Sequence, residues 1–545
     1  MHRFRPILFS LLLLVTSVAC GAAPAPAAPA PVTAAPHPGQ MSPTSHATPR
    51  YDTAASAPLT DLWVDPLHGA DSQSGASRDQ ALRTIRAAWN RIPQATPLTN
   101  GYRIWLVAGD YPEESFPTYW EERYGTPAAP IFIQSADGPL AARLHGSLNL
   151  YDVRYLYWID LEVRNAGDVF HCERCDHLLL RGVRFDGGNR QAHETVKVNQ
   201  SQHVYIEDSD IGGSYENAID FVAVQYGHIV GNRIHAADDW CIYLKGGSAY
   251  YRIEGNEIYD CGTGGFTAGQ GTGFEYMVSP WLHYEAYDLK FINNVVHDTD
   301  GAGFGVNGGY NILLAYNTLY RVGARSHGLE FVFGLRTCDG DTTRCRAHQA
   351  AGGWGTANSQ EEPIPNRNVY VYNNILYNPA DVSSQWQHFA IYGPRQPSPD
   401  ANIPNPARTD DNLQIRGNLI WNGPPDLPLG IEDGEACQAD NPTCNAAQLR
   451  AENTINVVEP ALVDPAHGDF RPVAGGNVFD APTFAIPPFP AWAPLTPPVP
   501  AGNLDNTVAT DRAGNPRVAS GPPGAYVGQG DPTLQRFYLP LVVAS

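Results

Sequence analysis

The sequence is poor in charged residues and in methionine. Asp, Glu, Lys and Arg make up 17% of it and Met occurs three times, whereas about a quarter of an average soluble domain is charged. After the first twenty residues it also lacks any apolar run long enough to cross a bilayer. Glycine, proline and aromatic residues are abundant instead. This composition is typical of an exported, β-rich protein with many turns.

The charge that is present is mostly negative, with a formal net charge of −21 at pH 7. Such a balance argues against non-specific binding to nucleic acid, because the phosphates would be repelled. It allows an acidic polymer as a partner only where a local group of basic residues or bound cations compensates the charge. A carboxylate-rich surface also simply keeps an exported protein soluble.

The N-terminus predicts a targeting segment. A basic start and the short apolar stretch of residues 7–15 predict a signal peptide over residues 1–20. Residues 17–20, Ser-Val-Ala-Cys, resemble a bacterial lipobox with Cys20 as the lipidated residue, although Ser-Val-Ala also fits an ordinary cleavage site. Residues 21–60 are rich in Ala, Pro, Ser and Thr and predict a tether. We therefore expect an extracellular or cell-surface protein held to the membrane by a lipid anchor.

Eight further cysteines remain, and an even number in an exported chain indicates disulfides. Cys338 with Cys345, and Cys437 with Cys444, would each close a small loop, and the connectivity of the other four stays open. Residues 171–177 contain two Cys and two His, which also fits zinc. A disulfide-closed turn is the favoured interpretation there, because an exported protein meets an oxidising compartment.

A short repeat decides the expected fold. The pattern apolar, two residues, Asn, one residue, apolar is centred on Asn232, Asn256, Asn294, Asn317, Asn374 and Asn418. With degenerate copies included, successive centres from residue 161 to 256 are 22, 26, 23 and 24 residues apart. This period, with short β-branched and aromatic strands, predicts an all-β right-handed parallel β-helix whose coils stack about 4.8 Å apart. A leucine-rich-repeat fold is disfavoured because the Leu consensus of such repeats is absent. A β-propeller is disfavoured because each of its blades needs about 40 residues, which is longer than this repeat.

The β-helix domain is expected to cover residues 61–527, with loop insertions near 271–288 and 338–365. Residues 78–92 predict an amphipathic helix that caps the N-terminal end of the solenoid. Residues 528–545 are expected to form a C-terminal tail without an assigned role, and its last part, residues 537–545, is apolar. The opening and closing segments resemble those of exported, pectin-lyase-like right-handed β-helix proteins.

Aligning the coils on their Asn position predicts which side chains stack on the outer face of one sheet. In the strand ten to thirteen residues after that Asn, alternate residues point outward. One outward column is Lys197, Asp220, Tyr243 and Thr267; a second contains Asn199, Val222, Lys245, Gly269 and Asn307; Glu330 joins the face one coil later. We expect Lys197, Asn307 and Glu330 to contact a bound substrate.

Acidic residues gather at the turn that enters these strands. Glu216 is expected to stack near Asp239, so that Glu216, Asp220, Asp238 and Asp239 lie within two coils of Lys245. Like charges this close raise one another's pKa or bind a cation, which makes the four carboxylates candidate metal ligands. The alternative is that the Asp pair only stabilises the turn.

The first insertion carries aromatic residues, among them Trp281 and Tyr284. Beside an outward strand face they are expected to line a sugar-binding groove, because ring faces stack on the C–H surfaces of sugars. The alternative is a self-packed loop whose aromatics bury one another. His327 and Arg336 flank the same face and form a rival catalytic centre.

The same stretch resembles known polysaccharide enzymes. Residues 238–247, Asp-Asp-Trp-Cys-Ile-Tyr-Leu-Lys-Gly-Gly, resemble the Asp-Asp-Cys-Ile strand of polygalacturonase-type glycoside hydrolases. Residues 217–220, Asn-Ala-Ile-Asp, are similar to their Asn-Thr-Asp motif. Trp240 is an extra residue, and the Gly-His-Gly and Arg-Ile-Lys motifs of those hydrolases are absent.

The stretch also resembles calcium-dependent β-helix polysaccharide lyases. That resemblance implies Asp220, Asp238 and Asp239 as Ca²⁺ ligands and Lys245 as the catalytic base. The calcium ion would neutralise the carboxylate of a uronate and acidify its C5 proton. Lys245 would abstract this proton, and Tyr243 or water would protonate the leaving oxygen.

Three functions are therefore open. The favoured hypothesis is a calcium-assisted lyase that cleaves an acidic polysaccharide by β-elimination. The second is an inverting glycoside hydrolase, for instance with Asp220 and Asp239 as acid and base about 6.5–9.5 Å apart. The third is a non-catalytic surface protein that binds glycan or another cell.

Overall fold

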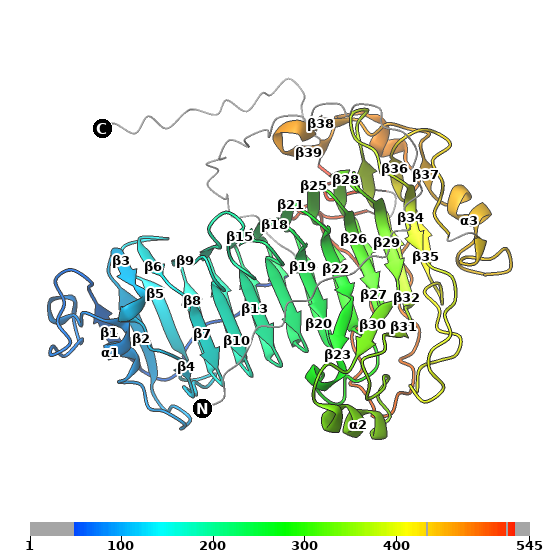
Figure 1. The fold of residues 1–545 in the computed structure, drawn as a ribbon. Coiled ribbons are helices and arrows are strands. Elements are labelled where there is room, and N and C mark those ends of the chain that lie inside the picture. The colour runs from blue at the N-terminus through cyan, green and yellow to red at the C-terminus, as the bar shows by residue number, and fades with distance from the viewer. Residues whose placement is uncertain (1–47, 432–433, 519–520, 529–545) are drawn as a thin grey trace, which may run out of the picture. The chain divides into compact units, whose positions relative to one another are not determined.

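Parallel β-strands wind through three long sheets, which we call sheets A, B and C. The structure is a computed structural model that describes residues 48–431, 434–518 and 521–528. Most coils contribute one strand to each sheet in turn, and each strand pairs in parallel with a strand of the next coil (Figure 1). This arrangement confirms the predicted parallel β-helix.

The strands of each sheet follow in spatial order. Sheet A contains β1 (Leu59–Val64), β2 (Gly101–Leu106), β5 (Ile131–Ser135), β8 (Arg154–Ile159), β11 (Asp176–Arg181), β14 (Gln202–Glu207), β17 (Gln225–Val230), β20 (Ser248–Glu254), β24 (Ala286–Ile292), β27 (Gly309–Ala315), β32 (Arg367–Tyr372) and β35 (Gln414–Arg416). Sheet B contains β3 (Gly109–Pro112), β6 (Ala142–His145), β9 (Glu162–Arg164), β12 (Arg184–Asp186), β15 (Asp210–Ser214), β18 (Arg233–Ala237), β21 (Glu257–Cys261), β25 (Val295–Thr299), β28 (Thr318–Val322), β33 (Ile375–Tyr377), β36 (Leu419–Trp421) and β37 (Thr454–Ile455). Sheet C contains β4 (Trp120–Glu121), β7 (Leu148–Tyr151), β10 (Phe170–Glu173), β13 (Val196–Asn199), β16 (Ile219–Val222), β19 (Trp240–Lys245), β22 (Gly264–Gly269), β26 (Ala302–Asn307), β29 (His327–Val332) and β34 (Gln387–Ile391).

Columns of apolar side chains fill the space between the sheets. In sheet C, Val196, Ile219, Ile242 and Phe266 stack one coil apart and are fully buried. Strand residues alternate between the two faces, so the residues between them point outward. Each fully buried side chain of this size contributes roughly 1.5–3 kcal/mol, and the repetition of the column makes the core continuous along the coils.

A ladder of buried asparagines fixes the turn between sheets A and B. Asn256 shows the pattern: its Nδ2 donates to Ile229 O in the preceding coil (2.9 Å) and to Asn294 Oδ1 in the following coil (3.0 Å). Its Oδ1 accepts from both the main-chain and the side-chain amide of Asn232 (2.9 Å each). The ladder continues through Asn317, Asn374, Asn418 and Asn453. These bonds set the rise from coil to coil.

The two predicted insertions come together beside sheet C. β23 (Gly271–Gly273), β30 (Gly334–Thr337) and β31 (Glu362–Ile364) form a small sheet, and α2 (Thr342–Ala350) packs close to it. The chain thereby builds a separate small core of Phe274, Met277 and Leu282 at this place.

The predicted capping helix is much shorter than expected. Only α1 (Ile85–Trp89) is α-helical, after a short 3₁₀ turn at residues 78–80. Leu82 makes two backbone hydrogen bonds with the end of β1, to Trp63 O and from Asp65 N (2.8 Å each), and this extended pairing excludes a helix there. Ile85 and Trp89 are still buried in the main core.

The predicted signal peptide, Cys20 and almost all of the C-terminal tail lie outside the described residues. Residues 48–60, assigned to the tether, instead pack on the solenoid, where Arg50 pairs with Asp208 and the Tyr51 main-chain amide donates to Glu207 (2.7 Å). In the part of the chain that the structure describes, no helix has the length and apolarity needed to span a membrane.

Four disulfides join the eight cysteines that follow Cys20. They are Cys172–Cys175, Cys241–Cys261, Cys338–Cys345 and Cys437–Cys444. The two small loops are closed as predicted, and the disulfide alternative is confirmed for the segment that also fitted zinc. Cys241–Cys261 links sheet C to sheet B of the next coil.

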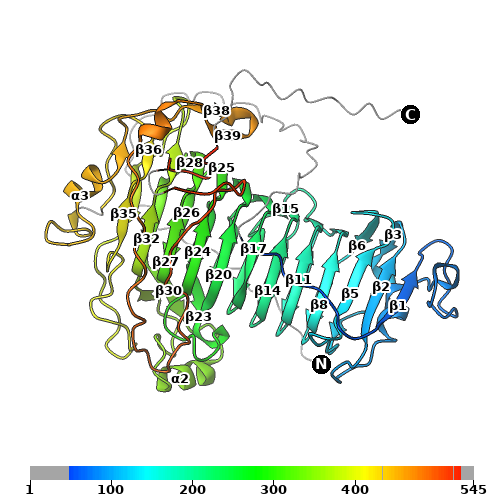
Figure 2. The same ribbon diagram turned by 180° about the vertical axis from the view of Figure 1, so that it is seen from behind.

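After β37 and α3 (Ala446–Ala451) the chain turns back along the solenoid. The hairpin of β38 (Leu462–Asp464) and β39 (Asp469–Pro472) packs beside sheet B through Phe470, and the later segment lies on the outer face of sheet A (Figure 2). Phe489 and Val508 contact apolar residues of β24, β27 and β32 there, and Lys290 donates to Asn503 O (2.9 Å). This part of sheet A is therefore covered by the chain itself.

The asparagine ladder yields a stability prediction. Replacing Asn294 by Ala removes its donors and acceptor and leaves buried partners without hydrogen bonds, at about 1–3 kcal/mol for each such group. We expect the free energy of unfolding in urea to fall by several kcal/mol, about 2–5. Asn90→Ala, at an exposed position, is the control and should change it by less than about 0.5 kcal/mol. Equal effects of the two substitutions would contradict a structural role of the ladder.

Candidate functional site

The outer face of sheet C has the side-chain columns that the repeat predicts. Lys197, Asp220, Tyr243 and Thr267 are direct neighbours in register on β13, β16, β19 and β22. Lys245 lies beside Val222 in the second column. The parallel register therefore brings together charged residues that are 23 and 25 positions apart in the sequence.

Two lysines converge on one buried carboxylate. Asp220 exposes 1% of its surface, and the Lys197 ammonium donates to its Oδ2. Lys245 Nζ lies 3.9 Å from the same oxygen and 4.0 Å from the centre of the Tyr243 ring. Lys197 also donates to Glu194 (3.1 Å), which precedes β13 and is buried as well. We call Glu194, Lys197, Asp220, Tyr243 and Lys245 the lysine–aspartate centre.

Lysine is rare in this protein, which makes their convergence informative. The chain has 35 Lys and Arg residues, but only three are lysines: Lys197, Lys245 and Lys290. Lys290 lies on sheet A, where its ammonium donates to main-chain carbonyls of the C-terminal segment. An ammonium group can lose its proton near neutral pH when its surroundings favour this, whereas a guanidinium does not. The rarity of lysine is visible in the sequence itself.

The two carboxyls of the centre differ in protonation. Burial and the neighbouring Asp220 carboxylate raise the pKa of Glu194 to about 8, so Glu194 is mostly protonated at neutral pH. Burial opposes ionisation of Asp220 too, but Lys245 and Lys197 outweigh it and lower its pKa. Burial would lower the pKa of Lys197, yet Asp220 and Glu194 raise it. Lys197 thus pairs with the Asp220 carboxylate, and Lys245 is a second basic residue beside the same oxygen.

Tyr243 completes this centre as a buried hydroxyl. Burial, reinforced by the nearby Asp220 charge, raises its pKa well above the ordinary value, so the hydroxyl keeps its proton. The hydroxyl oxygen faces the start of the first insertion, where the Gly271 amide lies 3.4 Å away.

The other predicted carboxylates divide into two groups. The Asp239 main-chain amide bonds to Glu216 O (3.1 Å), so these two stack as predicted. Burial raises the pKa of Asp239, and the charges of Glu216 and Asp220 add to this. Asp238 points elsewhere, because it is exposed and pairs with Arg190 (2.6 Å).

The arrangement does not fit the expected Ca²⁺ site. Calcium takes six to eight oxygen ligands, whereas Asp220 is already bound by ammonium groups and Asp238 by a guanidinium. Among the described residues, the carboxylates of Glu216, Asp220, Asp238 and Asp239 do not form a group with the spacing of metal ligands. We therefore derive no chemical step through a cation at this place.

The predicted aromatic wall is buried. Trp281 and Tyr284 expose only 5% and 4% of their surfaces and pack with Tyr310 and Trp354 inside the insertions. Arg336 is fully buried, and its Nε and Nη2 both donate to Glu285 Oε1 (2.9 and 2.5 Å). The burial of Trp281 and Tyr284 corrects the expectation that they line a sugar-binding groove. The burial of Arg336 removes it from the rival catalytic centre that the sequence suggested with His327.

A second polar group lies farther along the same face. Asn307 Nδ2 donates to Glu330 Oε1 (2.8 Å), and the other oxygen of Glu330 lies 2.9 Å from His327 Nε2. The Trp240 side chain lies between this group and the lysine–aspartate centre, packed where Gly264 and Gly305 leave room for it. Glu330 is four strands from Asp220, or about 19 Å at ~4.8 Å per strand.

Exposed aromatic rings follow sheet C, although not where the sequence predicted them. Among the described residues, the large aromatic side chains that are exposed are Tyr119, Tyr151, Tyr215, Tyr276, Trp386 and Tyr392. Tyr151 belongs to β7, and Tyr119, Trp386 and Tyr392 directly flank β4 and β34. Tyr215 lies in the turn between β15 of sheet B and β16 of sheet C. The Tyr276 carbonyl accepts from Gln200 at the end of β13 (2.9 Å). No such clustering is visible in the sequence, because the rings come from turns of unrelated length.

The matching family has the same architecture. Residues 168–334 match the model of the family described as "Right handed beta helix region". The fold is a right-handed parallel β-helix. The matched segment contains all residues of the lysine–aspartate centre as well as Asn307 and Glu330.

Solved structures resemble this β-helix only distantly. A pectate lyase, Pel9A, has 17% sequence identity over 50% of this chain and 72% of its own, with a TM-score of 0.38. A rhamnogalacturonan lyase has 12% identity over 66% and 87%, with a TM-score of 0.42. The tailspike protein of Dettilon has 11% identity over 68% of each chain, with a TM-score of 0.36. No curated protein matches the sequence significantly.

The raised pKa of Glu194 predicts a pH-dependent stability. Because the pKa rises from 4.5 to about 8 on folding, the contribution of the bound proton is complete below pH 4.5 and is lost as the pH rises towards 8. The wild type should therefore lose stability against Glu194→Gln between pH 5 and 8, as measured by urea unfolding. Glu114→Gln, at an exposed position, is the control. Parallel pH profiles of wild type and Glu194→Gln would disprove the raised pKa.

Proposed function

We propose that this protein binds an acidic polysaccharide along sheet C and cleaves it by β-elimination at the lysine–aspartate centre. The observation that carries the proposal is the convergence of two of the three lysines on one buried carboxylate. In a protein of net charge −21, the two lysines are a local group of basic residues, which favours a polymer that bears carboxylates.

The two lysines have different surroundings and therefore different roles. Lys197 contacts two carboxyls that raise its pKa, so it stays charged and neutralises the carboxylate of a uronate residue. Lys245 is 3.9 Å from Asp220, beyond hydrogen-bond distance, and its Nζ lies over an aromatic ring. Because Lys245 makes no hydrogen bond with Asp220 at this distance, we assign it as the base.

The proposed reaction needs one proton acceptor and one proton donor. Lys245 in its neutral form takes the C5 proton, which is acidified by the adjacent carboxylate once Lys197 neutralises the charge. The electron pair forms the C4–C5 double bond as the C4–O bond breaks. Tyr243, whose hydroxyl keeps its proton, donates to the leaving oxygen. The products are a chain with a new hydroxyl end and a chain with an unsaturated uronate.

The exposed aromatics support binding of a carbohydrate chain on the same face. Tyrosine and tryptophan rings offer flat apolar surfaces with a polar edge, which suits sugar rings. From β4 to β34 the face is about 43 Å long at ~4.8 Å per strand, so a polymer rather than a single sugar fits it. Asn307 and Glu330 lie farther along and are proposed to contact the polymer.

A hydrolase is the second candidate, and one observation favours it. Asp239 and Asp220 have pKa values displaced in opposite directions, upward and downward, which is the pattern of an acid and a base. In that reaction Asp239 protonates the glycosidic oxygen and Asp220 activates water. Lys245 is then not needed as a proton acceptor, so the two mechanisms predict different effects of substituting Lys245 and Asp239 on the activity.

Exchanging lysine for arginine at each position tests the assigned roles. The measurement is the ultraviolet absorbance of unsaturated uronates released from pectate, alginate or glycosaminoglycans. Lys245→Arg should lose about 10²–10⁴-fold in rate, because arginine cannot give up its proton. Lys197→Arg should retain much of the activity, because the positive charge remains. Lys290→Arg, on sheet A, is the matched control and should behave as the wild type.

Four other results of these assays would each contradict part of the proposed lyase mechanism. Equal loss in both arginine variants would contradict separate roles for the lysines. Reducing ends without unsaturated products, abolished by Asp239→Asn, would replace the lyase by the hydrolase. Polymer binding without cleavage would leave a glycan-binding protein. Activity lost on chelation would overturn the metal-free assignment and require a calcium site, whereas we expect none.

A further inference from the structure

A serine, a histidine and a glutamate form a hydrogen-bonded chain at the start of β29. Ser326 Oγ lies 3.0 Å from His327 Nδ1, and His327 Nε2 lies 2.9 Å from Glu330 Oε2. The tautomer with the proton on Nε2 satisfies both contacts, since Nδ1 then accepts from the serine hydroxyl. Asn307 holds the second glutamate oxygen (2.8 Å). In this tautomer Ser326 donates to His327, and His327 donates to the Glu330 carboxylate, which Asn307 holds in place.

The fold explains why these residues keep this geometry. His327 is the first residue of β29, and Glu330 is three residues later on the same strand. The Ser326 main-chain amide bonds to Gly323 O (2.9 Å), and its carbonyl accepts from the Trp386 amide (3.2 Å), so the serine is held at both sides. His327 is buried and Ser326 is half-buried.

We propose that Ser326, His327 and Glu330 form a second catalytic centre that hydrolyses carboxylic esters carried by a carbohydrate. A nucleophile in hydrogen-bond reach of a base that a third group orients is the arrangement required for acyl transfer. The ester chemistry stands on this geometry alone. That the ester is carried by a sugar rests on the proposed function, because the centre shares sheet C with the lysine–aspartate centre.

The reaction balances with water as the only co-reactant. Ser326 Oγ attacks the ester carbonyl while its proton moves to His327 Nδ1, and Glu330 stabilises the resulting imidazolium. The C–O bond to the alcohol breaks, and His327 returns the proton to the leaving sugar oxygen. Water then attacks the acyl-serine with the same proton transfers and releases the carboxylic acid and free serine.

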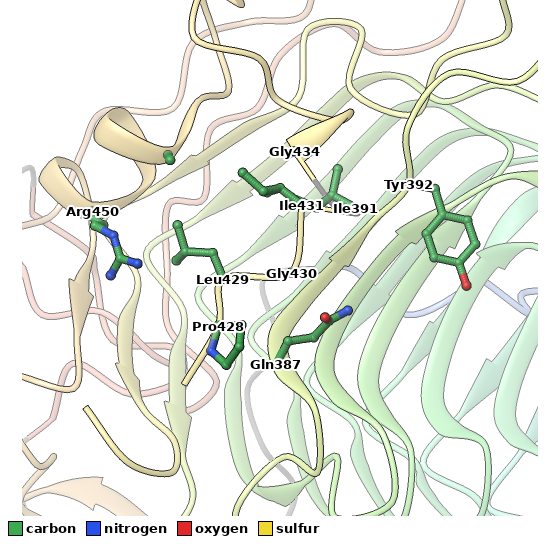
Figure 3. A pocket seen from close by; sticks show the side chains of 10 residues that line it. Gln387, Ile391, Tyr392, Pro428, Leu429, Gly430, Ile431, Gly434 and Arg450 are labelled. Carbon is green, nitrogen blue, oxygen red and sulfur yellow. The ribbon is translucent and has the colours of Figure 1, made fainter. Parts of the chain in front are cut away.

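A cavity lies at β34, the strand that pairs with β29. It has a volume of about 630 Å³ and is lined by Gln387, Ile391, Tyr392, Leu429 and Arg450 among others (Figure 3). Gln387 pairs directly with His327 in the register of β34 and β29. Trp386, which is 57% exposed, precedes it. Apolar, aromatic and basic side chains in one cavity suit a sugar ring with an attached acyl group.

Covalent labelling tests the nucleophile directly. The purified wild-type protein is treated with a fluorophosphonate probe, and the modified residue is identified by mass spectrometry. We expect the label on Ser326 and its loss in Ser326→Ala and His327→Ala. Hydrolysis of p-nitrophenyl acetate should fall by about 10²–10⁴-fold in the same variants. Ser383→Ala, an exposed serine in the loop before β34, is the matched control and should change neither readout.

The variants distinguish a failure of the ester centre from a failure of the proposed lyase. Ser326→Ala should retain β-elimination, and Lys245→Arg should retain hydrolysis of p-nitrophenyl acetate. An unlabelled wild type, or labelling and hydrolysis unchanged in a folded Ser326→Ala, would overturn the ester centre. Labelling of Ser326 without release of acetate from O-acetylated polysaccharides would overturn the carbohydrate ester as its substrate.

Discussion

The side-chain columns on the outer face of sheet C depend on the coil-to-coil register. A solenoid of parallel strands has no sequence-local way to choose its register, because neighbouring strands are one coil apart in the chain. The buried amides of Asn232, Asn256 and Asn294 make this choice, since each must meet a partner at the same turn of the next coil. A slip by one residue would orphan these amides and turn the core column outward. The same register places Asp220 between Lys197 and Tyr243.

The C-terminal segment covers part of the outer face of sheet A and so limits the surface that a substrate can reach there. The C-terminal segment lies on sheet A, where Phe489 and Val508 complete an apolar cluster. Sheet C carries the exposed aromatics on its strands and flanking turns instead. The insertions rise beside this face and are locked by the buried ion pair of Glu285 and Arg336. The strands of sheet C are rigid elements, so side chains on them keep their positions more precisely than side chains on loops.

Prediction from the sequence succeeded where periodicity carries the information. The Asn repeat gave the fold, and the alternation within each strand gave the column Lys197, Asp220 and Tyr243. Prediction failed where the chain leaves the repeat. Trp281 and Tyr284 lie in an insertion whose own core needs them, and the short length of α1 follows from a pairing of Leu82 with β1 that no local pattern reveals.

Glu194 shows a further limit of the sequence. It lies in a turn before β13, and its contact with Asp220 arises only because the coils stack. The two lysines, in contrast, could have been recognised from the sequence as two of three in the chain. The rarity of lysine in the composition therefore points to these two positions, whereas the spacing of the repeat alone does not single them out.

The lysine–aspartate centre is difficult to explain by stability alone. Removing a carboxylate and two ammonium groups from water costs several kcal/mol per ion, and well-packed apolar residues at such positions are often as stabilising or more so. Neighbouring positions of the same face show that apolar packing is available there, since Trp240 and Val222 are buried beside the centre. A chain that uses arginine for almost all its basic positions nevertheless keeps lysine at both positions around Asp220. At position 245 this choice fits the base that we propose, because an arginine there would form the stronger bidentate contact but could not take up a proton from a substrate.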